Sequence, residues 1–209
     1  MRRIATALGV ALIATGAQAS MITNFTSSAG FIGLGSFNGS MEWDYSGTGR
    51  HGMLYVTVEN TSDPVNGGYV TAFGFNAVDG VRLQYRRRDS GEGVSPHWKR
   101  VRNADADPFG PLDFGLALFG QFRGHRDPAE GIATGASRTF AFRVHGRQSV
   151  LQELSPLDFL DESTGEAFVA RYTGFESGHS DLVNAALPAP GALPLLAMGL
   201  GAARRRRAR

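Results

Sequence analysis

The segment that decides the fold reads Met53-Leu54-Tyr55-Val56-Thr57-Val58-Glu59. Apolar and polar side chains alternate along it, so Leu54, Val56 and Val58 share one face. Successive side chains of a β-strand point to opposite sides, and this alternation therefore predicts a half-buried strand. The polar segment 60–64 ends in proline and predicts the turn that closes the strand.

The same period of two recurs through residues 20–185. Clear alternation predicts further strands at 69–75, 81–87, 97–102, 140–144 and 168–173, and weaker alternation predicts strands at 22–25, 41–45 and 114–119. A short helix is expected at 155–158, where a serine cap precedes a proline. These elements predict an all-β fold: an antiparallel β-sandwich of about seven to nine short strands with one short helix.

Composition and charge exclude several classes of protein. The chain has 209 residues and no cysteine, which permits one domain and excludes disulfides and thiolate metal sites. Seven of its 21 lysines and arginines lie at the two ends, so residues 20–185 carry 14 basic residues against 19 acids, a formal charge of −5. The basic character therefore belongs to the ends, and we expect no nucleic-acid partner.

The N-terminal end has the pattern of a secretory signal peptide. Arg2 and Arg3 precede an apolar stretch, and Ala17 and Ala19 form a small-x-small cleavage site. The prediction is a signal helix over residues 1–19 that engages the secretion translocon and is removed by signal peptidase. A buried N-terminal helix is the alternative.

The C-terminal end, residues 186–209, has three parts. The sequence Pro188-Ala189-Pro190-Gly191 predicts an extended, accessible spacer. Twelve mostly apolar residues follow, fewer than a helix needs to span ~30 Å of hydrocarbon. Arg204, Arg205, Arg206 and Arg207 then favour the cytoplasmic side. We expect a short hydrophobic helix that holds the exported chain transiently at the inner membrane; a disordered basic tail is the alternative.

This order of Pro-x-Pro, apolar stretch and arginine cluster resembles the PEP-CTERM sorting signal of Gram-negative bacteria, which exosortase recognises. Ala189 stands where that family usually has glutamate, so the tail is similar to a Pro-Ala-Pro variant. The resemblance implies processing by an exosortase-type transpeptidase and a final location at the cell surface or outside the cell. A sortase signal is the alternative, since residues 187–191 approach Leu-Pro-x-Thr-Gly with proline in place of threonine.

The region before the tail also resembles the sandwich domains often found upstream of such signals. Segments 56–62, 70–76, 135–140 and 170–175 carry this likeness, and they are strands with their turns. The resemblance implies an extracellular domain whose biochemical role is mostly undefined.

Residues 82–102 hold seven cations and two acids, a local charge of +5. Strands 81–87 and 97–102 are predicted to pair as a hairpin around a loop that contains Gly91 and Gly93. The candidate ligand-binding residues are Arg82, Arg86, Arg88, Trp98, Arg100 and Arg102, with Trp43 and Tyr45 as further aromatic candidates. Arginine pairs with carboxylates and a tryptophan ring stacks on sugars, so the hypothesis is a module that binds acidic exopolysaccharide. Alternatively, the charges only prevent edge-to-edge pairing.

Catalytic motifs are missing from the sequence. It contains no Gly-x-Ser-x-Gly elbow, phosphate-binding loop or His-Glu-x-x-His pair, and its five histidines are scattered. We expect a non-enzymatic protein without a cofactor; a secreted hydrolase stays open, because 19 acids can supply a carboxylate pair. Calcium is the one candidate metal, with Asn103, Asp105, Asp107 and Asp113 as oxygen ligands, although these residues are also ordinary turn formers.

Overall fold

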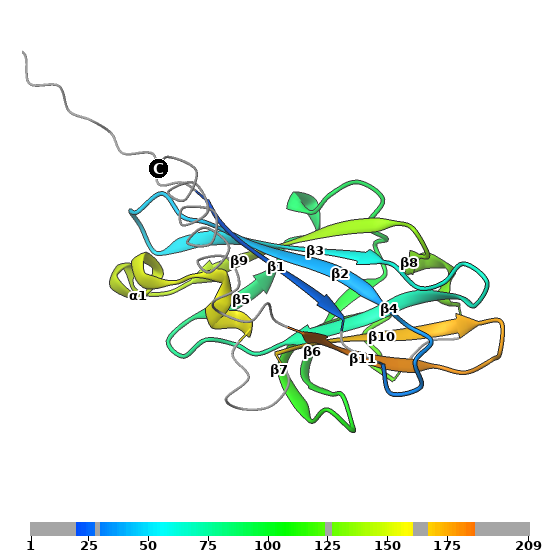
Figure 1. Cartoon of the computed structure of the whole chain (residues 1–209). Helices are drawn as coiled ribbons and strands as arrows, with labels where there is room; N and C mark the ends of the chain where they lie inside the picture. The colour runs from blue at the N-terminus through cyan, green and yellow to red at the C-terminus, as the bar shows by residue number, and fades with distance from the viewer. Residues whose placement is uncertain (1–19, 28–29, 124–126, 161–166, 187–209) are drawn as a thin grey trace, which may run out of the picture.

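The computed structural model describes residues 20–27, 30–123, 127–160 and 167–186, which are mostly antiparallel β-strand (Figure 1). The predicted signal segment with Ala17 and Ala19 lies outside the described residues. So do the tail from residue 187 onward and the two terminal helices expected there.

Within these residues the chain forms eleven strands, one α-helix and three short 3-10 turns. The strands are β1 (Met21–Ser27), β2 (Phe37–Asp44), β3 (His51–Asn60), β4 (Gly67–Phe75), β5 (Arg82–Tyr85), β6 (Trp98–Asp105), β7 (Pro111–Leu118), β8 (Ile132–Ala133), β9 (Ser137–His145), β10 (Phe168–Phe175) and β11 (Asp181–Ala186). The helical elements are α1 (Gln148–Glu153), η1 (Arg87–Asp89), η2 (Pro128–Glu130) and η3 (Pro156–Leu160).

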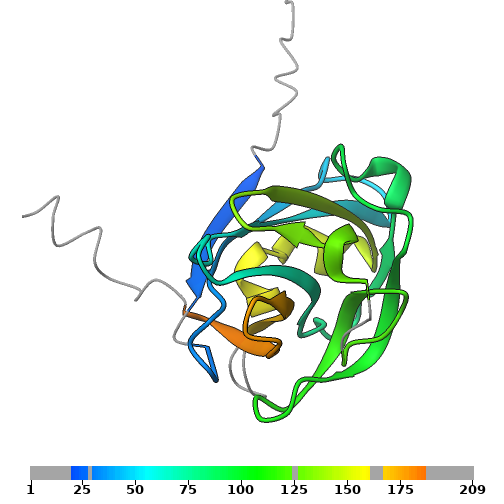
Figure 2. The ribbon, with the colours of Figure 1, turned by 90° about the vertical axis from the view of Figure 1, so that its right-hand side faces the viewer.

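All eleven strands belong to one nearly closed sheet. Its order is β5-β9-β3-β2-β1-β11-β10-β4-β7-β6, with β8 on β4, and every pair is antiparallel. The first five strands form one half of the sheet and the other six form the second half. The sheet curls so that the halves face each other across the core (Figure 2).

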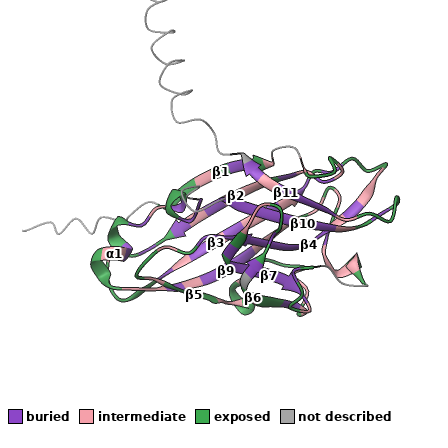
Figure 3. Cartoon of the chain, turned by 90° about the horizontal axis from the view of Figure 1, so that it is seen from below, coloured by how far each residue is buried: buried purple, intermediate pink, exposed green. Residues whose placement is uncertain are grey.

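Aromatic side chains from both halves fill that core. The ring centroids of Phe73 on β4 and Phe140 on β9 lie 4.9 Å apart, and those of Phe114 on β7 and Phe142 on β9 lie 5.2 Å apart. Buried residues run along the strands, whereas the loops and α1 are largely exposed (Figure 3). The alternation seen in the sequence separates core from solvent along β2 and β3, whereas β4, β7 and β10 contain stretches buried on both faces.

The halves are connected where β1 meets β11, and we call this contact the joint. Its ladder has two pairs, Thr26 with Ala186 and Ser27 with Ala185. The carboxylate of Asp181, which is 2% exposed, strengthens the region by accepting four backbone N–H groups at 2.9–3.0 Å. The donors are Ile32, Leu34, Gly35 and Leu182. One buried acid thus fixes the loop that leads from β1 into β2.

The structure confirms the all-β, antiparallel prediction and corrects details of it. Strands occur at every predicted position, and the described residues form eleven strands rather than seven to nine. The helix expected at 155–158 is the 3-10 turn η3, while α1 directly precedes it. The predicted hairpin is wrong, because β5 pairs with β9 and β6 pairs with β7. Among the described residues, no helix is both long and apolar enough to cross a membrane.

Candidate functional site

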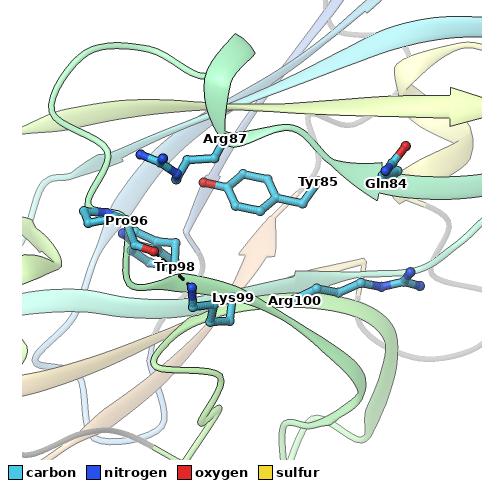
Figure 4. A pocket seen from close by; sticks show the side chains of 7 residues that line it. All are labelled: Gln84, Tyr85, Arg87, Pro96, Trp98, Lys99 and Arg100. Atoms are coloured by element: carbon cyan, nitrogen blue, oxygen red, sulfur yellow. Dashed lines mark hydrogen bonds between the residues drawn. The ribbon is translucent and has the colours of Figure 1, made fainter.

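The two ends of the sheet, β5 and β6, approach each other without pairing. A hollow of about 350 Å³ lies between them, and we call this opening the seam (Figure 4). Its lining residues are Gln84, Tyr85, Arg87, Pro96, Trp98, Lys99 and Arg100. A second hollow of about 300 Å³ adjoins it, lined by Tyr85, Arg86, Arg87 and Arg88. The predicted cationic segment thus lies at the open side of the fold.

Backbone hydrogen-bonding groups of both edge strands face the seam. Arg86 N donates to Ala141 O at 2.8 Å, so alternate residues of β5 bond to β9 and Tyr85 directs its N–H and C=O the other way. Phe119 N donates to His97 O at 2.8 Å, and by the same alternation Arg100 directs its backbone groups toward β5. In the part of the chain that the structure describes, no ladder joins these edges.

Three cations line the hollow itself. Arg87 reaches it from η1, and Lys99 and Arg100 reach it from β6 (Figure 4). The Arg100 guanidinium lies 4.8 Å from the centre of the Phe114 ring, which orients it. Burial, and then the nearby charges of Arg102 and Arg82, lower the pKa of Arg100. The guanidinium remains charged at neutral pH, because an arginine titrates far above it.

Tyr85 supplies the aromatic surface of the seam. Its half-buried ring lies between the cations, with the hydroxyl end directed toward Arg87 (Figure 4). Burial raises the pKa of the Tyr85 phenol, against smaller lowering effects of Ser90 and Arg87. The side chain is therefore neutral at physiological pH, and its ring centroid lies 6.5 Å from that of Phe140 and 5.8 Å from that of Phe142.

The stacking role predicted for Trp98 is wrong. Its side chain is only 2% exposed and belongs to the core, with ring centroids 4.9 Å from Phe140 and 5.9 Å from Phe73. Trp43 and Tyr45 are also buried, at 3% and 5% exposure, and stack on each other. These three rings have no face to offer a ligand, because Trp43 and Trp98 occupy inward positions of their strands and Tyr45, just after β2, is buried as well.

Of the predicted cations, Arg100 lines the hollow and the others are distributed around the seam. Arg82, Arg88 and Arg102 are exposed, and Arg82 lies on the outer side of β5. Arg86 is half-buried and pairs with Asp89 at 3.1 Å. The sequence prediction missed Arg87 and Lys99, which line the hollow. Strand β5 ends at Tyr85, and Arg87 lies in the 3-10 turn that follows it.

The three predicted acidic calcium ligands, Asp105, Asp107 and Asp113, do not form a metal-binding group among the described side chains. Asp105 pairs with Arg123 at 3.1 Å, and Asp113 accepts the backbone N–H of Ala77 at 3.2 Å. Across the described ranges, no group of three or more acidic or histidine side chains is placed to hold a metal ion. Asp105 and Asp113 serve a surface ion pair and a loop contact, as ordinary polar residues at strand ends do.

A polar cluster beside the seam contains a serine, a histidine and an acid. The Glu130 carboxylate accepts hydrogen bonds from Ser95 Oγ and contacts His97 Nδ1. The His97 ring stacks on Phe119, with centroids 4.5 Å apart. In a serine hydrolase the imidazole stands between the serine and the acid, whereas here the acid is the central member. The cluster anchors the loop before β6 to η2 rather than activating Ser95.

Compared with family models, curated proteins and solved structures, the chain matches none. The functional argument therefore rests on the seam's own geometry. A groove with three cations, one neutral aromatic ring and backbone N–H donors along both edges can hold an extended anionic chain.

Proposed function

We propose that this chain is an exported, non-enzymatic surface protein that is processed at its C-terminal sorting signal and whose β domain binds acidic exopolysaccharide in the seam. The observation that carries the binding proposal is the position of Arg87, Lys99 and Arg100 around the Tyr85 ring. These groups line the open side of a domain whose overall charge is negative.

Export and sorting are supported by the order of features at the two ends. A basic, apolar and Ala-x-Ala succession opens the chain, and Pro-Ala-Pro-Gly, an apolar stretch and four consecutive arginines close it. Intact-mass analysis of protein recovered from the outside of native cells tests this part. We expect a chain that starts at Ser20 and ends within residues 188–191, with any group that the transpeptidase has attached. Full-length protein in the cytosol would refute it.

We also propose that the two halves of the sheet act as the two layers of a β-sandwich. The ring contacts between Phe73 and Phe140 and between Phe75 and Phe142 support this, since each joins one half to the other. In this architecture the joint is the closed side and the seam is the open side.

The proposed binding at the seam is supported by the fit between its side chains and the carboxylates and sugar rings of an acidic polysaccharide. Arginine presents paired N–H donors that fit a carboxylate, and the neutral Tyr85 ring offers a face for a sugar. Carboxylates spaced along a polyuronate can reach the cations of both β6 and η1. Such binding weakens as salt is added, because screening reduces the attraction between exposed charges.

The test compares polygalacturonate binding by two double variants at several salt concentrations. Arg87→Gln with Arg100→Gln removes two seam cations, and we expect a roughly tenfold loss of affinity with a weaker salt dependence. Arg123→Gln with Arg147→Gln removes the same charge from exposed positions elsewhere and serves as the control. Equal losses in the two variants would show that only net charge matters and would refute a specific site.

A further inference from the structure

The outer surface of the first half carries two parallel rows of short polar side chains. In one row the register places Asn24, Ser40, Thr57 and Thr139 directly opposite one another on β1, β2, β3 and β9. In the next row it places Thr26, Asn38, Glu59 and Ser137 opposite one another on the same strands. We call these eight side chains the polar patch. The four strands lie side by side (Figure 1).

The polar patch is accessible and hollowed. Asn24, Thr26, Asn38 and Ser137 are exposed, and the other four side chains are half-buried. A depression of about 200 Å³ is lined by Asn24, Asn38, Gly39, Ser40, Thr57, Glu59 and Ser137.

Hydrogen-bonding capacity in the patch is only partly used. Thr57 and Thr139 share a hydrogen bond of 2.8 Å, and Asn38 Nδ2 donates to Glu59 Oε2 at 3.2 Å. Within the described part of the chain, the side chains of Asn24, Ser40 and Ser137 have no hydrogen-bond partner among other residues. Hydroxyls and amides both donate and accept, as the hydroxyls of a sugar do.

The charge around the patch disfavours an anionic ligand. Glu59 is the single charged member, and Glu42 occupies the adjoining row next to Tyr55. Burial, and then the charges of Asp44, Asp89 and Glu42, raise the pKa of the Tyr55 phenol, consistent with an acidic surrounding. Tyr55 is half-buried and places one aromatic ring beside the two polar rows.

We infer that the polar patch binds a neutral polysaccharide, separately from the seam. Its hydroxyls and amides would exchange hydrogen bonds with the sugar hydroxyls, and Tyr55 would bound the groove at one side. The patch and the seam differ in charge and lie in different places on the fold. The domain would therefore hold neutral and acidic chains at two sites.

The experiment measures equilibrium binding of dextran, a neutral glucan, and of polygalacturonate to the same protein samples. Ser40→Ala with Thr57→Val removes two hydroxyls while keeping residues that a strand tolerates, and we expect a roughly tenfold loss of dextran affinity. Thr57→Ser keeps the hydroxyl and is expected to retain dextran binding. Thr48→Val, in the exposed β2–β3 turn, is the matched control and is expected to leave it unchanged.

Polygalacturonate binding reports whether the double variant is folded and separates this inference from the proposed function. Loss of dextran binding with polygalacturonate binding intact supports the polar patch. Dextran binding that is equal in wild type and double variant overturns the inference. A wild-type protein that binds polygalacturonate but no dextran also overturns it, while leaving the seam proposal in place.

Discussion

The joint and the seam are the two places where the halves of the sheet come together, and they are built in opposite ways. At the joint, two ladder pairs close the gap, and Asp181 binds four backbone N–H groups behind them. At the seam, the described edge strands share no ladder and cations line the opening. Buried hydrogen bonds support the closed side, whereas exposed cations lie along the open side.

Removing the Asp181 carboxylate tests the joint and should have the largest effect. Asp181→Ala leaves four backbone N–H groups without their acceptor, and at about 1 kcal/mol each the free energy of unfolding should fall by about 4 kcal/mol. Chemical denaturation measures it. Asp79→Ala, at an exposed position, is the control and should change stability by less than about 0.5 kcal/mol. A loss below about 1 kcal/mol in Asp181→Ala would contradict the assigned role.

Substitutions of Trp98 and Tyr85 should affect different properties: the stability of the fold for Trp98 and the affinity for the ligand for Tyr85. Trp98→Leu should lower the free energy of unfolding by about 3 kcal/mol, because the ring packs on Phe73 and Phe140 in the core. It should change polygalacturonate affinity by less than about twofold. Tyr85→Leu should lower the free energy of unfolding by less than Trp98→Leu does, and it should clearly lower the affinity for polygalacturonate. If instead Trp98→Leu lowered the affinity and Tyr85→Leu did not, Trp98 would be a ligand-binding residue and Tyr85 would not.

Relieving repulsion at the seam should stabilise the fold slightly. Arg82 acts on both Arg100 and His145, and the pKa of each is lowered in part by its charge. Arg82→Gln should raise the free energy of unfolding by about 0.5 kcal/mol at low salt, and the gain should vanish as salt is added. Arg147→Gln is the control at an exposed position. A gain that persists at high salt would point to a cause other than charge.

The smallest expected effect is a pH dependence from His145. Burial, followed by Arg82, Arg143 and His51, lowers the pKa of this imidazole below its ordinary value. The unfolded chain therefore takes up the proton first, so this contribution is complete above about pH 6.5 and is lost as the pH falls through the folded pKa. His145→Gln should flatten thermal stability between pH 8 and pH 5.5. His179→Gln, at an exposed position, should leave the curve unchanged.

Local alternation was sufficient to predict most strands but not their pairing. Val56 and Phe140 each lie in a strand predicted from its period of two, and both are buried as expected. Strand β11 was missed because Leu182 and Val183 are adjacent and both buried, which removes the alternation. Helix α1 was missed because the residue before it, Arg147, provides no side-chain cap.

The sequence predicted which charged residues gather at the candidate site, but it did not predict how they are arranged. The cluster of cations at 82–102 was evident from the sequence, but neighbouring strands usually pair, and here β5 and β6 are the two ends of the sheet. Three residues decide the difference: the Trp98 ring is buried in the core, whereas Arg87 and Lys99 are exposed at the opening. The directions of Trp98 and Lys99 follow from the pairing of β6 with β7, and Arg87 lies in the turn after β5. That β5 pairs with the distant β9 rather than with β6 leaves no local signal in the sequence.

Under the proposed processing at the C-terminal tail, the short ladder of the joint has a mechanical consequence. A pull on the tail enters the described domain at Ala186, whose ladder partner is Thr26. The two ladder pairs of the joint would bear the pulling force first and would break one after the other. Beyond them, the Asp181 carboxylate accepts hydrogen bonds from three backbone N–H groups of the loop between β1 and β2. The domain would open slightly at the joint, next to its C-terminal end, while its core stays folded.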